Sequence, residues 1–333
     1  MTEDISAVRS TGIGSWPGTD MADALKVSFE ECPDLPYLPE LPARGSHAQM
    51  VGRAAAFLAG LAVDLSPAGW RLSDVVGRDH RLATATLRSD LDLLEEVAQG
   101  YAGPVKISVA GPWTLAASLD RPRGDRVLAD PGARRDLGLS LAEGTGLLIN
   151  DLRRRLPDLQ FRVQLDEPSL PGVLAGSIAN SSGFFRYRAI DVAEVSATLR
   201  HVVASVSATG AAVTVHGCAA ELPISLLRNG GVAGIYLDLD QLSAADWDEI
   251  AACLENGVEI GFGAAPTDRA MTGDDIARRV LGHVHDLGLE PAVSGRMVIT
   301  PACGLASLSP DRAISTLRMV RKAAAIVTEE LAD

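Results

Sequence analysis

Three side chains of the kinds that bind zinc stand at two separate places in the chain. His216 and Cys218 end an apolar run of β-type residues, and Cys303 follows 85 residues after Cys218 in the segment Thr-Pro-Ala-Cys-Gly-Leu. Successive side chains of a strand point to opposite faces, so His216 and Cys218 are expected on the same face. One imidazole and two thiolates suit zinc, and three protein ligands leave a position for a substrate. The pattern predicts a zinc site that activates a substrate thiol.

A His-x-Cys pair is a weak signal by itself, because a buried cysteine commonly serves as a small apolar side chain. The context strengthens it. Both segments end strand-like runs that are followed by helix-like ones, and such strand ends converge in a barrel.

Strand-like and helix-like segments alternate almost throughout the chain. Eight strands are predicted, at 8–16, 36–41, 103–110, 160–166, 211–216, 232–238, 257–263 and 296–301. This alternation implies parallel pairing with right-handed crossovers. Eight such units in 333 residues predict an α/β fold, a (βα)8 TIM barrel with loop insertions at its C-terminal face, as a single domain over residues 1–333.

An open doubly wound sheet is the alternative. Gly12 and Gly14 suggest a dinucleotide loop, but a third glycine is missing and Pro17 follows closely, which argues against that fold. The loop-rich stretch 167–188 is longer than an ordinary connection and is typical of an insertion over an active site. In a barrel, seven strand ends would each bring a polar or glycine residue to one face: Ser15, Gly111, Asp166, His216, Asp238, Gly263 and Cys303.

Capping residues mark the starts of several helices. Asp130 and Ser309 each precede a proline, which suits the first helical position. Ser46 and Gln49 fit a capping box ahead of an alanine-rich run. Helices are therefore expected to begin at these three places.

Composition excludes several classes of protein. The net charge of −13 argues against nucleic acid or an anionic membrane surface as a partner. Four cysteines without regular spacing do not indicate a disulfide framework. The first residues lack the basic and apolar regions of a secretory signal, and no apolar run approaches the length of a membrane span. A soluble cytoplasmic protein is expected.

Five short segments resemble the catalytic barrel of cobalamin-independent methionine synthase, which is related to uroporphyrinogen decarboxylase. They occur in the family's order and are 13–17 (IGSWP), 111–115 (GPWTL), 164–168 (QLDEP), 216–218 (HGC) and 301–305 (PACGL). The resemblance covers roughly residues 10–325. It implies a zinc-dependent methyltransferase of methionine biosynthesis with homocysteine as acceptor and a methyl-folate or a methyl-corrinoid protein as donor.

The resemblance implies roles for particular residues in holding Zn²⁺. His216, Cys218 and Cys303 match three of the family's zinc ligands. Asp238 stands where the family has a glutamate, and Asp240 is the alternative. A bound metal would lower the pKa of the substrate thiol, so that its sulfur reacts as a thiolate.

The family's homocysteine-binding segments also have counterparts. Ile13, Gly14 and Ser15 would offer backbone and hydroxyl groups to the substrate carboxylate. Asp166, followed by Glu167, would pair with the substrate ammonium through a charge-assisted hydrogen bond.

Other expected parts of the site are altered or missing. Trp16 and Trp113 are candidates to stack on a flat methyl donor. Segment 43–47 has no acid where the family places a second carboxylate, and Asp268 is the nearest replacement for a catalytic histidine. These departures leave three alternatives open: a uroporphyrinogen decarboxylase-like enzyme, a methyltransferase for another small thiol, and a non-catalytic zinc- or thiol-binding relative.

Overall fold

Eight parallel strands form one curled sheet at the centre of the molecule. The structure is a computed structural model that describes residues 7–180, 183–289 and 291–332. The strands follow one another around the sheet in the order β1 (Arg9–Ser10), β10 (Met297–Pro301), β9 (Glu259–Ala265), β8 (Gly234–Asp238), β7 (Ala212–Gly217), β6 (Leu159–Asp166), β5 (Gly103–Ala110) and β2 (Tyr37–Leu38). All eight strands predicted from the sequence are confirmed, although β1 and β2 are only two residues long.

The two edge strands approach each other just beyond their ends. Ser15 and Glu40 form an isolated parallel bridge there. The Trp16 N–H donates to the Glu40 carbonyl at 2.8 Å, and the Glu40 N–H donates to the Gly14 carbonyl at 3.0 Å. These two hydrogen bonds link β1 to β2, so that the curled sheet has the form of a TIM barrel.

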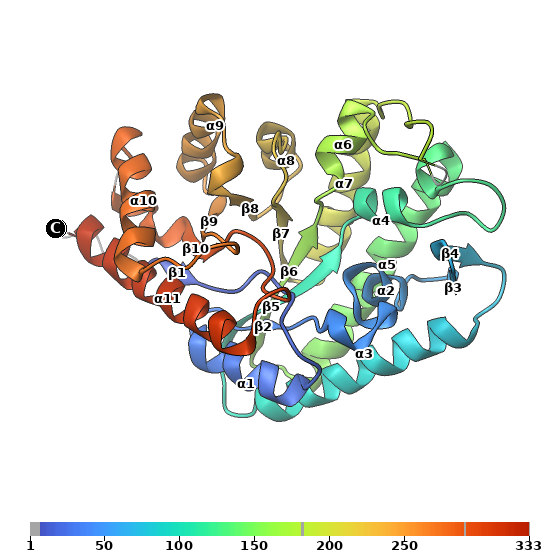
Figure 1. Ribbon diagram of the computed structural model, residues 1–333, viewed down its shortest axis with the longest axis horizontal. Coiled ribbons are helices and arrows are strands. Elements are labelled where there is room, and N and C mark those ends of the chain that lie inside the picture. The colour runs from blue at the N-terminus through green and yellow to red at the C-terminus, as the bar shows by residue number, and fades with distance from the viewer. Residues whose placement is uncertain (1–6, 181–182, 290, 333) are drawn as a thin grey trace.

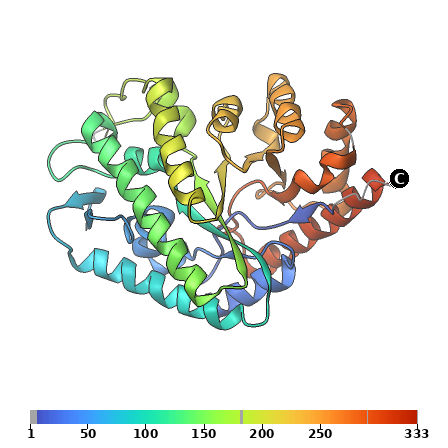
Figure 2. The same cartoon turned by 180° about the vertical axis from the view of Figure 1, so that it is seen from behind.

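Helices surround the sheet in both views (Figures 1 and 2). They are α1 (Met21–Glu31), α2 (Met50–Ala55), α3 (Arg78–Val97), α4 (Pro112–Ser118), α5 (Pro131–Arg155), α6 (Leu170–Ala175), α7 (Val192–Ser207), α8 (Ile224–Asn229), α9 (Ala244–Glu255), α10 (Gly273–Asp286) and α11 (Pro310–Ala332). Short 3-10 turns lie between them, among them η1 (Pro42–Arg44), η2 (Ser46–Ala48) and η4 (Leu239–Gln241). In the part of the chain that the structure describes, no helix combines the length and apolar character that a membrane crossing requires.

The strands separate two kinds of environment, because their side chains alternate between faces. Val105, Ile107 and Val109 of β5 join a single apolar cluster with side chains of the surrounding helices. Lys106 and Ser108 of the same strand point the other way, into the barrel, where both donate hydrogen bonds to backbone carbonyls of the segment after β1. The barrel interior therefore holds polar groups beneath its C-terminal face.

Two of the three predicted helix starts are confirmed. Asp130 caps α5, where its carboxylate accepts from the Ala133 N–H at 3.0 Å, and Ser309 Oγ accepts from the Arg312 N–H at 3.4 Å. The capping box at Ser46 is wrong, because Ser46 begins the 3-10 turn η2 and α2 starts only after Gln49. The hairpin of β3 (Ala62–Ser66) and β4 (Gly69–Ser73) was not predicted.

Helix α5 packs closely on the chain that follows α2, and this contact gives a stability prediction. A Cβ at Gly144 would lie 1.9 Å from the Phe57 carbonyl oxygen, whereas one at Gly146 would meet only Thr209 Cγ2 at 3.7 Å. Gly144→Ala is expected to lower the free energy of unfolding by about 1–3 kcal/mol through overpacking. Gly146→Ala should raise it by about 0.5–1 kcal/mol, because alanine favours a helix interior.

Urea unfolding of the two variants checks this prediction. The matched control is built in, since both substitutions add one methyl group to the same helix. Equal effects of the two substitutions would contradict the close contact between α5 and residues 57–59.

Candidate functional site

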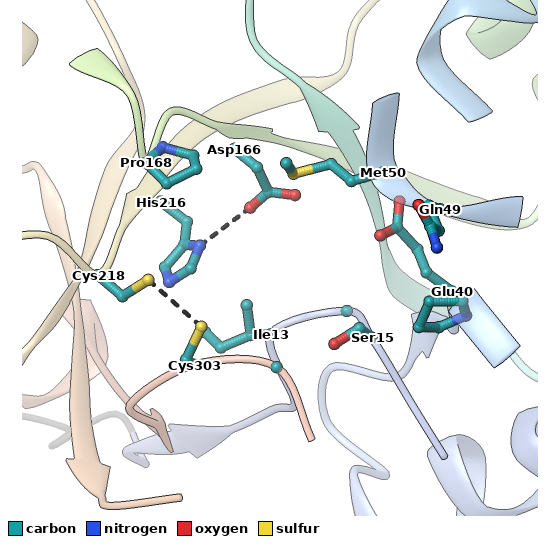
Figure 3. Close-up of a pocket in the computed structure, with 13 residues that line it drawn as sticks. Ile13, Ser15, Glu40, Gln49, Met50, Asp166, Pro168, His216, Cys218 and Cys303 are labelled. Atoms are coloured by element: carbon teal, nitrogen blue, oxygen red, sulfur yellow. Dashed lines mark hydrogen bonds and ion pairs between the residues drawn. The ribbon is translucent and has the colours of Figure 1, made fainter. Parts of the chain in front are cut away.

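A cavity of about 340 Å³ opens at the carboxyl ends of the strands. Figure 3 shows side chains from several strands and from α2 that face it. Its lining consists of Ile13, Gly14, Ser15, Glu40, Pro42, Gln49, Met50, Asp166, Pro168, His216, Cys218, Cys303 and Gly304. Seven of the residues predicted for the site are among them.

Two cysteines from distant parts of the chain meet at this cavity. Cys218 directly follows β7, Cys303 follows β10, and their Sγ atoms lie 3.3 Å apart (Figure 3). The hydrogen bond from the Cys218 thiol lowers the pKa of Cys303 to about 6 and raises the pKa of Cys218. A thiolate is the form of cysteine that binds metals and attacks electrophiles. Cys303 is therefore primed for such chemistry near neutral pH.

His216 is held by a carboxylate on the neighbouring strand. Asp166 ends β6 and pairs in register with His216 of β7, and Asp166 Oδ1 lies 3.0 Å from His216 Nδ1. The other ring nitrogen, Nε2, is buried and has no hydrogen-bond partner among the described residues. Figure 3 shows this nitrogen on the side of the two sulfur atoms. A carboxylate that orients one ring nitrogen leaves the other free for a ligand.

His216, Cys218 and Cys303 together offer the nitrogen and sulfur donors that zinc prefers. The buried, unpartnered Nε2 and the paired sulfurs fit such an ion chemically. Over residues 7–180, 183–289 and 291–332, no three histidine, cysteine or acidic side chains are arranged closely enough to hold a metal. In this arrangement the two sulfurs contact each other instead.

Asp238, the predicted fourth ligand, does not line the cavity. Its carboxylate caps η4 by accepting from the Asp240 N–H at 2.9 Å. The alternative, Asp240, forms ion pairs with Arg269 and Arg279 at the surface. Ligation by either carboxylate stays a prediction.

The segment after β1 forms one wall of the cavity. Ile13, Gly14 and Ser15 all line it, and their role in binding the substrate carboxylate stays a prediction. Ser15 is fixed against the loop that carries Cys303, because its carbonyl accepts from the Leu305 N–H at 2.8 Å. A Cβ at Gly304 would lie only 2.0 Å from Ser15 Oγ, so any side chain there would have to displace the Ser15 hydroxyl.

Glu40 is a cavity residue that the sequence interpretation missed. Segment 43–47 carries no acid, yet Glu40 at the end of β2 brings a buried carboxylate to the wall opposite the cysteines (Figure 3). Its Oε1 has no hydrogen-bond partner among the described residues, and Arg53 Nε lies 3.7 Å away. Burial raises the pKa of Glu40 to about 7. Its place near the carboxyl end of the second predicted strand, 36–41, was the signal that could have identified it.

Glu167 has a structural partner and does not line the cavity. Its carboxylate accepts from the Trp113 N–H at 2.9 Å and from the Thr114 N–H and hydroxyl at 2.7 and 2.8 Å. It thereby accepts hydrogen bonds from N–H groups that have no partner within the first turn of α4, as a carboxylate does at a helix N-terminus. The interaction joins α4 to the end of β6, next to Asp166.

The remaining predicted residues are not brought to the cavity. Trp16 and Trp113 are both buried, and the Trp113 indole N–H donates to the Val195 carbonyl at 3.4 Å. Asp268 is exposed beside Arg269. Roles for these three in donor binding or catalysis stay predictions that their positions do not favour.

Comparisons with known proteins agree with this geometry. A family model described as "Cobalamin-independent synthase, Catalytic domain" matches residues 124–326, more than half of the chain. Among solved structures, a B12-independent methionine synthase from Shewanella sp. W3-18-1 in complex with selenomethionine superposes with a TM-score of 0.60 at 14% identity, covering 98% of this chain and 99% of that one.

Other solved structures match less well. A β-galactosidase from the psychrophilic Marinomonas ef1 gives a TM-score of 0.48 at 10% identity, over 97% of this chain and 62% of that one. A D-psicose 3-epimerase from Clostridium cellulolyticum H10 gives 0.45 at 10% identity, over 97% and 99%. A search of curated proteins finds no significant match.

Proposed function

Because this chain belongs to the cobalamin-independent methionine synthase family, a family of methyltransferases, we propose that it transfers a methyl group to the thiol of homocysteine, giving methionine. Residues 1–333 would act as one catalytic domain. The observation that carries the proposal is a cavity with two thiols and an oriented histidine at one end, the buried carboxylate of Glu40 on the opposite wall, and the carboxylate of Asp166 between them (Figure 3). A small amino acid with a thiol side chain is complementary to both ends.

The sulfur end of the cavity would hold zinc. His216, Cys218 and Cys303 would be its protein ligands, with Asp238 as a fourth if it leaves its capping position. When bound, zinc lowers the pKa of a coordinated thiol, so that the substrate sulfur is a thiolate at neutral pH. Asp166 keeps the His216 ring in the orientation that such a ligand requires.

The other end would bind the amino-acid group of the substrate. Asp166 and Glu40 present two carboxylates for its ammonium, and charge-assisted hydrogen bonds of this kind are strong. Gly14 and Ser15 would offer N–H and hydroxyl groups to the carboxylate. The substrate is thereby oriented with its sulfur toward Cys218 and Cys303.

The reaction forms a bond between the substrate sulfur and the methyl carbon. The bond from the methyl group to its donor breaks, and the donor keeps the electron pair. A methyl-folate or a methyl-corrinoid protein would supply the methyl group. Met50, Gln49 and Pro168 also line the cavity and are candidates to contact the donor.

Methionine production tests the proposal. The purified protein is incubated with zinc, L-homocysteine and either 5-methyltetrahydrofolate or methylcobalamin, and methionine is measured by mass spectrometry. Methionine formed by the wild type but not by His216→Ala supports the proposal. Equal background from both proteins with every donor would contradict it and favour a binding role.

Glu40 gives a pH prediction for substrate affinity. Because burial raises its pKa to about 7, Glu40 is mostly neutral below that pH and ionises as the pH rises. Only the ionised form attracts an ammonium, so the KM for homocysteine is expected to fall between about pH 6 and pH 8. Glu40→Gln should remove this part of the pH dependence and raise KM by about 10–100-fold, the range for a hydrogen bond to a charged group.

The thiol acid 4-mercaptobutyrate, which lacks the amine, is the matched control substrate. Its KM should respond to pH equally in the wild type and in Glu40→Gln. A Glu40→Gln enzyme with an unchanged homocysteine KM profile would exclude Glu40 from the ammonium subsite.

A further inference from the structure

A buried lysine lies inside the barrel beneath the cavity. Lys106 of β5 is fully buried, and its Nζ donates to the carbonyls of Gly12 at 2.6 Å and Ile13 at 2.9 Å and to Gln164 Oε1. The rings of Tyr37 and Tyr236 lie 5.6 and 5.5 Å from Nζ. Burial lowers the pKa of Lys106 to about 7, while nearby acidic groups, Asp166 first among them, favour its charged form. A charge this costly to bury, and outside the cavity lining, calls for a function.

Lys106 fixes the direction of a chain of hydrogen bonds that leads to His216. An ammonium only donates, so the oxygen of the Gln164 amide must face it. The amide nitrogen then points the other way, where it donates to Asp166 Oδ1 at 2.7 Å. The same Oδ1 lies 3.0 Å from His216 Nδ1 and accepts its proton, which leaves Nε2 as the nitrogen with a free lone pair.

A flipped amide would break this chain. Gln164 Oε1 would then face Asp166 Oδ1, and two acceptors repel each other. Asp166 could relieve the repulsion by turning away, and this change would weaken its hold on His216.

A second branch of the network holds the turn after β1. The Ile13 carbonyl accepts from Lys106, from Gln164 Nε2 at 2.9 Å and from Ser108 Oγ at 3.0 Å. In a trans peptide the N–H points opposite to the C=O, so an Ile13 carbonyl held inside the barrel directs the Gly14 N–H toward the cavity. A Cβ at Gly14 would lie 2.9 Å from Ser108 Oγ, so the turn rests directly on these donors.

We propose that Lys106 and Gln164 are positioning residues that set both ends of the substrate site at once. Through Gln164 and Asp166, Lys106 selects the His216 tautomer with the proton on Nδ1. Through the Ile13 carbonyl, it aims the Gly14 N–H at the substrate carboxylate. The metal-binding and carboxylate-binding consequences rest on the proposed function, whereas the His216 tautomer does not.

The tautomer can be measured without metal, substrate or activity. Metal-free protein labelled with ¹⁵N-histidine gives two-bond ¹H–¹⁵N spectra that report which ring nitrogen carries the proton, and His216→Gln assigns the signal. The wild type is expected to show the proton on Nδ1. Lys106→Met and Gln164→Leu should each introduce the Nε2-protonated tautomer. Ser108→Ala is the matched control: it removes a donor to the Ile13 carbonyl and a 3.3 Å hydrogen bond from Gln164 Nε2, but it leaves the Lys106–Gln164–Asp166 chain in place and should keep the wild-type signal.

Zinc affinity reports on the branch that leads through Asp166 to His216, and the KM for homocysteine reports on the branch that holds the Ile13 carbonyl. Lys106→Met and Gln164→Leu should each weaken zinc binding by about 10–100-fold, as loss of an outer partner of a ligand does. In the Gln164→Leu background, Lys106→Met should have no further effect on zinc. Ser108→Ala should leave zinc affinity unchanged and raise the KM for homocysteine.

Gln164→Glu is a second variant in case Gln164→Leu does not fold. It keeps an acceptor for Lys106 but has no N–H to donate to Asp166. An unchanged His216 tautomer in Lys106→Met, Gln164→Leu and Gln164→Glu would overturn the inference, whatever the enzyme's activity. A wild type with the expected tautomer but no zinc binding would instead refute the proposed function alone.

Discussion

Cys303→Ser is expected to weaken zinc binding by more than about 100-fold and to remove methyl transfer. Loss of an outer partner alone costs about 10–100-fold in metal affinity, and loss of a ligand should cost more. A serine hydroxyl stays protonated at neutral pH and is a harder, poorer donor for zinc than a thiolate. Cys303 is also the cysteine whose pKa is lowered, to about 6, so it is the first of the pair to ionise.

Competition with a chromophoric zinc chelator measures this affinity. Cys253→Ala is the matched control, because Cys253 is a buried thiol of α9 that does not line the cavity. It should cost stability and leave zinc binding intact. A Cys303→Ser protein that binds zinc as the wild type does would remove Cys303 from the ligand set.

Asp166→Asn is expected to lower kcat/KM by about 100-fold or more, because Asp166 serves two partners. It accepts from His216 Nδ1 and stands in the cavity where the substrate ammonium would lie. Loss of the hold on His216 should weaken zinc binding by about 10–100-fold. Loss of the charge should separately raise the KM for homocysteine, by about 10–100-fold for a hydrogen bond to a charged group.

Saturating zinc separates the two roles of Asp166. With the metal site filled, the remaining defect should appear with homocysteine and disappear with 4-mercaptobutyrate. Asp268→Asn, at an exposed carboxylate beside Arg269, is the control and should match the wild type. A defect of equal size with both substrates would show that Asp166 acts only through His216.

The sequence pattern predicted the strands because they are apolar runs of β-type residues, and seven of them bring a polar residue or a glycine to their carboxyl ends. In a parallel barrel all such ends lie on one face, which is why Asp166, His216, Cys218 and Cys303 could be grouped before any contact was known. The register that pairs Asp166 with His216 then follows from adjacent parallel strands.

The side-chain partners were not predictable in the same way, because they come from segments far apart in the chain. Glu167 adjoins Asp166 in sequence, but its carboxylate satisfies the start of α4 and so lies outside the cavity. In the sequence, Lys106 is a single charged residue within an apolar strand. Its role depends on Gly12, Ile13 and Gln164, which only the closed barrel brings to it.

Calorimetric titration of the zinc-loaded protein with L-homocysteine, compared with L-homoserine, tests the central claim most directly. The two amino acids differ only in sulfur or oxygen at the end of the side chain. If the cavity holds zinc to activate a thiol, homocysteine will bind more tightly and release a proton, homoserine will release none, and the metal-free protein will not distinguish them. Equal binding of both by the zinc-loaded protein, without proton release, would contradict thiol activation at this site.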